Sequence, residues 1–234
     1  MMPSRLALSG ATLALALLLT GCAAPKPVAK ERLVQYDLGP ADVAPVPGAP
    51  PGGSVAGAPR LPPLKIVAVT APTALDSDRM LYRLVYADPR QARRYAGSRW
   101  TATPAQLLTE RLRDVLSRQA QILDGGDPER GAPLLKVALL DFSQRFDVPG
   151  AGRGVVVVRA SLLRDGHLLA QRDFGATVPS PTADAAGGAT AIAAAADAVV
   201  HEIGAWLDAG NAQAPSASRL PSPSPSSPLS PRGQ

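Results

Sequence analysis

The chain has 234 residues, with 24 lysines and arginines against 19 aspartates and glutamates, so its formal net charge is +5. This length suits one domain with tails, and the single cysteine excludes a disulfide framework and any zinc site built from several cysteines. The two histidines lie far apart in the chain, which argues against a histidine-rich metal site.

The first residues indicate an exported protein. An apolar run of about fourteen residues follows Arg5, which is shorter than the roughly 20 residues of a membrane span and typical of a secretory signal. The run ends Leu19-Thr20-Gly21-Cys22, which resembles the lipobox of bacterial lipoproteins. In that class the signal is cut before the cysteine, whose sulfur carries a diacylglycerol. We therefore expect a signal peptide over 1–21 and a lipid on Cys22; a chance cysteine after an ordinary signal is the alternative.

The residues after the lipobox bear on location. Ala23 and Ala24 follow the cysteine, and no aspartate stands directly after it. By resemblance to Gram-negative lipoproteins, this favours transport to the outer membrane, with the chain on the periplasmic face. We expect residues 22–32 to form a lipidated tether. Without the arginines of the signal and of the C-terminal tail, 21 basic and 19 acidic side chains remain, so the charge gives no argument for nucleic acid.

The rest of the chain divides into a domain and two unstructured stretches. We expect the folded domain over 33–209, with a disordered Pro/Gly-rich insertion at 39–63 and a disordered Pro/Ser-rich tail at 210–234. The first half of the domain predicts an edge strand at 33–38 and strands at 64–71 and 80–86, with turn chemistry at Asp76 and Asp78 between them.

A helix is predicted over 103–119. Thr103 is its N-cap, Pro104 suits the first turn, and Gln106 completes a capping box. Apolar residues at helical spacing give it a buried stripe (Leu108, Leu112, Val115, Leu116), with Leu107 on its flank. The charged residues are expected mostly on its wet side (Arg111, Arg113, Asp114, Arg118).

The second half predicts a meander and a final helix. A short strand is expected at 122–123, and the meander comprises strands at 134–146, 155–164 and 167–178, a loop at 150–154 and a tight primed turn at Asp165-Gly166. An alanine-rich helix follows at about 184–207, with one apolar face (Ile192, Ala196, Val199, Ile203, Trp206). Gly187 and Gly188 leave its start open. The predicted fold class is α/β (mixed α+β), with one mixed, largely antiparallel sheet and two principal helices.

Few residues suggest catalysis. No serine lies in a Gly-x-Ser-x-Gly elbow, and Cys22 is committed to lipid. His167 and His201 are interpreted as solvated side chains, and the glycines at 150–154 lack the helix, lysine and hydroxyl of a phosphate-binding loop. We expect no enzyme, no catalytic or metal site, and no cofactor besides the covalent lipid.

Several segments together carry a family resemblance. Tyr36-Asp37-Leu38 lies close behind the lipobox, and Ser77-Asp78-Arg79-Met80-Leu81-Tyr82-Arg83 comes next. Tyr95-Ala96-Gly97-Ser98-Arg99-Trp100 then precedes Pro104, Leu107-Leu108 and Leu112. In this order the chain resembles the ABC-type transport auxiliary lipoprotein family from about Cys22 to Trp206. The resemblance implies an outer-membrane adaptor that partners a mammalian-cell-entry (MCE) protein and its ABC transporter, which moves phospholipids or other lipophiles between the two membranes. A homo-oligomer is compatible with a ring-forming MCE partner.

Tyr95, Arg99 and Trp100 are the candidate partner contacts, because Tyr, Trp and Arg are enriched at interface hot spots. The alternative for Trp100 is that it fills the core where the strands meet the helix. Two other functions stay open: a periplasmic lipid-binding carrier, in which a helix covers an apolar groove and holds a phospholipid, and a cell-wall hydrolase.

Overall fold

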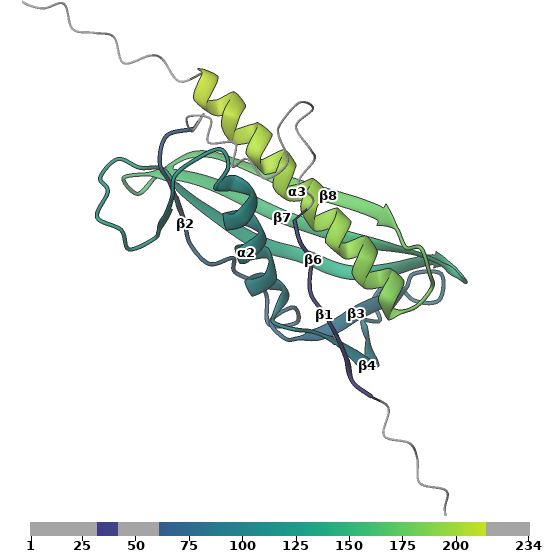
Figure 1. Cartoon of the computed structure of the whole chain (residues 1–234). Coiled ribbons are helices and arrows are strands. Elements are labelled where there is room, and N and C mark those ends of the chain that lie inside the picture. The colour runs from purple at the N-terminus through teal and green to yellow at the C-terminus, as the bar shows by residue number, and fades with distance from the viewer. Residues whose placement is uncertain (1–31, 42–60, 214–234) are drawn as a thin grey trace, which may run out of the picture. The chain divides into compact units, whose positions relative to one another are not determined.

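The computed structural model describes residues 32–41 and 61–213, which form one eight-stranded mixed sheet with two helices against it (Figure 1). The strands are β1 (Val34–Tyr36), β2 (Leu64–Ile66), β3 (Arg79–Leu84), β4 (Arg93–Trp100), β5 (Ile122–Asp124), β6 (Leu134–Val148), β7 (Ala151–Arg164) and β8 (His167–Pro179). The helices in these residues are α2 (Pro104–Leu116) and α3 (Ala185–Gln213). The predicted fold class is confirmed.

Strand β6 organises the sheet. One of its edges pairs with β7 along nearly its whole length, while its other edge pairs with β2 near its start and with β3 near its end. The antiparallel meander β6–β7–β8 is therefore confirmed. Asp165 and Gly166 both have positive φ, 49° and 80°, as a primed two-residue turn requires. β1 is the edge strand that the sequence predicts, and it runs parallel to β4.

The predicted loop at 150–154 is wrong. A tight turn at Pro149 and Gly150 joins β6 to β7, and β7 begins at Ala151. A Cβ atom on Gly154 would lie 2.4 Å from the backbone of Ala191 and Ile192 in α3. The glycine in β7 thus allows the helix to approach the sheet closely, and it has no part in a loop.

The sequence misses strand β4. Its residues include three arginines and the small residues Ala96, Gly97 and Ser98, so they show no apolar alternation by which to recognise a strand. Conversely, the strand predicted at 64–71 ends at Ile66, although Thr70 still forms one bridge to Ala138.

The predicted boundaries shift at several places. α2 ends at Leu116, before the expected 119, whereas α3 continues to Gln213 and so includes the first residues of the predicted tail. The predicted insertion 39–63 is too wide, because Leu61 is buried and its backbone N–H donates to the carbonyl of Gln119 at 3.0 Å. Residues 42–60 and 214–234 lie outside the described residues.

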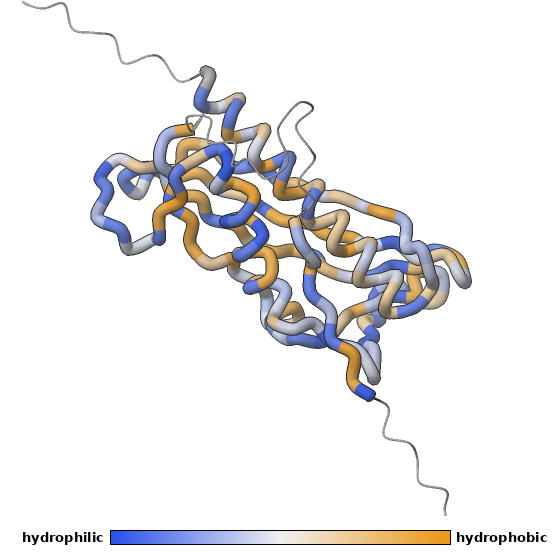
Figure 2. The backbone as a smooth tube through the Cα atoms, in the orientation of Figure 1, coloured by the Kyte–Doolittle hydropathy of each residue, from blue (hydrophilic) through white to orange (hydrophobic). Residues whose placement is uncertain are grey.

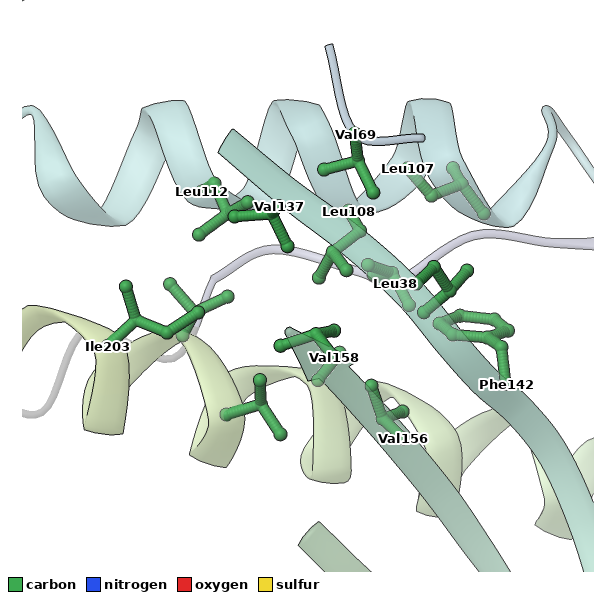
Figure 3. Close-up of a cluster of buried hydrophobic side chains, with 14 of the residues drawn as sticks. Leu38, Val69, Leu107, Leu108, Leu112, Val137, Phe142, Val156, Val158 and Ile203 are labelled. Carbon is green, nitrogen blue, oxygen red and sulfur yellow. The ribbon is translucent and has the colours of Figure 1, made fainter. Parts of the chain in front are cut away.

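Apolar side chains from both helices and the sheet form one core. Figure 2 shows apolar stretches along the strands and hydrophilic stretches on the outer loops. Figure 3 shows leucines of α2, Ile203 of α3 and the valines of β6 and β7 converging, with Leu38 beside Phe142.

Helix α3 is long and apolar enough to cross a membrane, but half of its apolar stretch is buried, as in a core helix.

Candidate functional site

The three predicted contact residues lie on β4, at the end of the sheet where β1 joins it. Trp100 is 1 % exposed, and its ring meets Phe142 edge-on with centroids 5.3 Å apart. A partner that docks on this fold cannot reach such a side chain. The contact prediction is therefore wrong for Trp100, and the core-filling alternative is the one that the structure supports.

Tyr95 is half-buried and held by a polar network. Its hydroxyl donates to Oε1 of Gln144 at 2.7 Å, and its ring lies 4.6 Å from that of Tyr82. Nε2 of the fully buried Gln144 donates in turn to Oγ of Ser180 at 3.0 Å. Burial raises the pKa of Tyr95 to about 12, so the hydroxyl stays a neutral donor. This network ties β4 to β6 and to the segment that leads into α3.

Arg99 is the most accessible of the three. Its Nη1 lies 3.2 Å from Oδ2 of Asp78, and about a third of its side chain is exposed. The backbone carbonyl of Asp78 also accepts the backbone N–H of Trp100, at 2.7 Å. Of the predicted contact residues, Arg99 alone presents a charged group at the surface, and its contact role stays a prediction.

A residue expected in solvent is central to the packing. Arg111 is 5 % exposed, its Nη1 lies 3.0 Å from Oδ1 of Asp197 in α3, and its Nη2 donates to the carbonyls of Leu38 and Gly39 at 2.5 and 2.7 Å. The prediction that Arg111 lies on the wet side of its helix is wrong. Its position, three residues after Leu108 and four before Val115, falls within the apolar stripe and could have indicated burial.

This ion pair joins three parts of the fold. Arg111 comes from α2, Asp197 from α3, and the two carbonyls from the segment directly after β1. Leu38 of that segment is buried, and Figure 3 shows it between α2 and Phe142. The segment that follows the predicted tether is thus fixed to both helices.

An apolar groove lies at the opposite end of the sheet. It has a volume of about 290 Å³ and runs between the last turns of α3 and the β7–β8 hairpin. Five of its eleven lining residues are leucines (Leu61, Leu64, Leu162, Leu169, Leu207), and Arg164 is the one charged residue in its lining. Leu168 and Leu169 beside it are 58 % and 50 % exposed. The groove can accommodate part of an acyl chain or an apolar side chain of a partner.

The histidines and the aspartates Asp124 and Asp127 do not lie together in one site. His167 and His201 are exposed, and Nδ1 of His201 lies 2.8 Å from the carbonyl of Asp197. Asp124 forms an ion pair with Arg113, and its backbone N–H donates to Asp127. In the part of the chain that the structure describes, no three histidines, cysteines or carboxylates gather as metal ligands would. Cys22 lies outside the described residues.

Comparisons with known proteins extend this description. The family model of the ABC-type transport auxiliary lipoprotein component matches residues 45–204. A crystal structure of a Xanthomonas campestris protein aligns with a TM-score of 0.58 at 21 % identity, over 66 % of this chain and 89 % of that one. An uncharacterized protein aligns with a TM-score of 0.55 at 16 % identity, over 76 % and 99 %. These two likenesses show a shared fold. No curated protein matches the sequence significantly.

Proposed function

The chain belongs to the ABC-type transport auxiliary lipoprotein component family, and on that premise we propose that it is a non-enzymatic adaptor of an MCE-type ABC transport system. The observation that carries the proposal is the family match over residues 45–204, which covers seven of the eight strands, all of α2, and α3 as far as Gly204. The lipobox at Leu19–Cys22 supports it from a part of the sequence outside that match.

The adaptor works from a membrane anchor. A lipid on Cys22 places the domain in the periplasm on the face of the outer membrane, and the tether of about ten residues limits the distance of β1 from the bilayer to about 35 Å. From there the domain docks onto the MCE protein, which conducts phospholipids or other lipophiles between the membranes. The chain itself performs no bond chemistry in this role.

Three measurements test the proposal: lipid labelling, partner capture and the permeability barrier after gene deletion. Cells fed labelled palmitate should label the wild-type protein and not the Cys22→Ser variant, and the label should fractionate with the outer membrane. The purified protein should capture the periplasmic MCE subunit of the transporter. Absence of capture in several detergents, together with an intact permeability barrier after gene deletion, would sink the adaptor role.

The apolar groove favours a second function, that of a lipid-binding carrier. Its leucine walls and single arginine suit an acyl chain with an anionic headgroup at the mouth. Native mass spectrometry of the gently extracted protein should then show a bound phospholipid. A variant with Leu162→Gln should lose that lipid, whereas Leu140→Gln, a change at an exposed leucine outside the groove, should keep it. A clean apo mass for the wild type removes the carrier function.

A further inference from the structure

Positive charge is concentrated on one hairpin. Residues 78–99, which hold β3 and β4, contain six arginines against two aspartates, a net charge of +4. The other described residues carry 12 basic and 15 acidic side chains, a net charge of −3. A domain that is close to neutral as a whole therefore has a basic end, which we call the basic hairpin.

The arginines of the basic hairpin are only partly neutralised. Within the described residues, its two aspartates pair with Arg90 and Arg99, and no ion pair involves Arg79 or Arg94, whose side chains are exposed. Arg79 also lies directly opposite Arg99 in the β3–β4 ladder. Like charges in facing positions of a ladder destabilise it, so an anionic ligand would relieve an unfavourable arrangement.

Exposed apolar side chains lie at the same end of the sheet. Tyr86 follows β3, and its backbone N–H donates to the carbonyl of Phe146, near Val148 at the end of β6. Leu33 and Val34 lie at the start of β1, beside β4. The side chains of Leu33, Val34, Tyr86 and Val148 are each more than 40 % exposed. Arginine and tyrosine with apolar neighbours are the side chains that suit the boundary between a bilayer and water.

The direction of β1 relates this end to the membrane anchor. β1 runs parallel to β4 with Val34 opposite Ser98 and Tyr36 opposite Trp100, so the chain enters the sheet from the side of the hairpin tip. β6 runs between the two ends of the sheet, and the nine residue steps from Leu135 to Gln144 span about 30 Å. The elements that line the apolar groove, the last turns of α3 and the β7–β8 hairpin, lie at the end of the sheet away from the basic hairpin (Figure 1).

The geometry points to a second contact with the membrane: the basic hairpin binds the phosphate groups of anionic phospholipids in the leaflet that holds the lipid of Cys22. This inference rests on the proposed lipid anchor. Guanidinium groups bind phosphate through paired hydrogen bonds, and the field of an anionic surface attracts them at short range. The anchor keeps the domain near the membrane, and the hairpin fixes its orientation, with the groove directed into the periplasm.

Vesicle sedimentation tests the inference without the anchor. Every described helix and strand lies within 34–213, so residues 22–234 with Cys22→Ser contain the fold and no acyl chain. This protein should sediment with vesicles that contain phosphatidylglycerol and not with phosphatidylcholine alone, and binding should fall as salt shortens the screening length. Arg79→Gln with Arg94→Gln should weaken binding roughly 25-fold, because each arginine contributes about a fivefold factor.

A matched variant controls for net charge. Arg130→Gln with Lys136→Gln removes the same two charges from exposed positions distant from the basic hairpin and should bind vesicles nearly as well as the parent protein. Equal losses in both variants, or no binding to anionic vesicles at low salt, overturn the inference. It is overturned as well if the Arg79/Arg94 variant keeps vesicle binding and loses MCE capture, since the hairpin then binds protein. Palmitate labelling and MCE capture report separately on the proposed function.

Discussion

Helices α2 and α3 lie over the same sheet, but their first turns are held by different groups (Figure 1). At the start of α2, the hydroxyl of Thr103 accepts the N–H of Gln106 at 3.4 Å, and Oε1 of Gln106 accepts the N–H of Thr103 at 3.1 Å. At the start of α3, Oδ1 of Asp184 accepts the N–H of Gly187 at 2.8 Å. One cap is neutral at every pH, and the other is a carboxylate.

The helices differ also in what fixes them to the sheet. α2 packs through large buried side chains on its apolar stripe, such as Leu108 and Leu112. α3 approaches closely through glycines: a Cβ on Gly188 would lie 2.4 Å from Oε1 of Gln144, and one on Gly154 would meet the helix backbone. The contrast teaches that α2 is specified mainly by its own sequence, whereas α3 depends on its neighbours in space.

The largest effect is expected where the two helices meet. Arg111→Met should lower the free energy of unfolding by about 3–5 kcal/mol, because the carboxylate of Asp197, whose side chain is only 16 % exposed, would lose the cation that faces it. Urea denaturation monitored by circular dichroism measures this change.

The double variant Arg111→Met with Asp197→Leu is the control, since it removes both charges and leaves apolar groups of similar size. It should recover much of the lost stability. A single variant that loses less than about 1 kcal/mol would show that the pair is effectively solvated, as surface pairs are.

Close approach of α3 predicts the next effect. Gly154→Ala should cost about 1–3 kcal/mol, because the added methyl group overlaps the backbone of Ala191 and Ile192 and the helix has to shift. Gly126→Ala, where a Cβ meets nothing within 4 Å, should leave the urea midpoint unchanged. Equal midpoints for the two variants would contradict close packing at Gly154.

The sequence predictions succeeded or failed according to how far apart in the chain the interacting residues lie. The cap at Thr103, the turn at Asp165-Gly166 and the apolar face of α3 were predictable because each depends on residues that are neighbours along the chain. Arg111 and Gly154 were misinterpreted because their partners lie on other elements, 86 and 37 residues away in sequence. For the candidate site, the sequence singled out Tyr95, Arg99 and Trp100, but it could not show that Trp100 is buried or that β4 pairs with β3 to bring the arginines of 78–99 onto one hairpin.

The cap of α2 predicts a smaller effect. Thr103→Ala should destabilise the protein by about 1 kcal/mol, since the N–H of Gln106 loses its acceptor. Thr103→Ser keeps an oxygen in place and should restore most of the loss. Because neither residue of this capping box titrates, the difference between wild type and Thr103→Ala should be the same at pH 7 and pH 3.

The cap of α3 should behave differently with pH. The N–H of Gly187 and the hydroxyl of Thr182 hold the pKa of Asp184 below its ordinary value of 3.8. A carboxyl with a lowered pKa stabilises the folded state fully above its unfolded pKa, and this contribution is lost as pH falls through its folded pKa. Asp184→Asn retains an acceptor for the cap at neutral pH but does not titrate. Urea midpoints should therefore fall less steeply below pH 4 for the variant than for wild type, and parallel curves would show that the charge of Asp184 does not contribute to the cap.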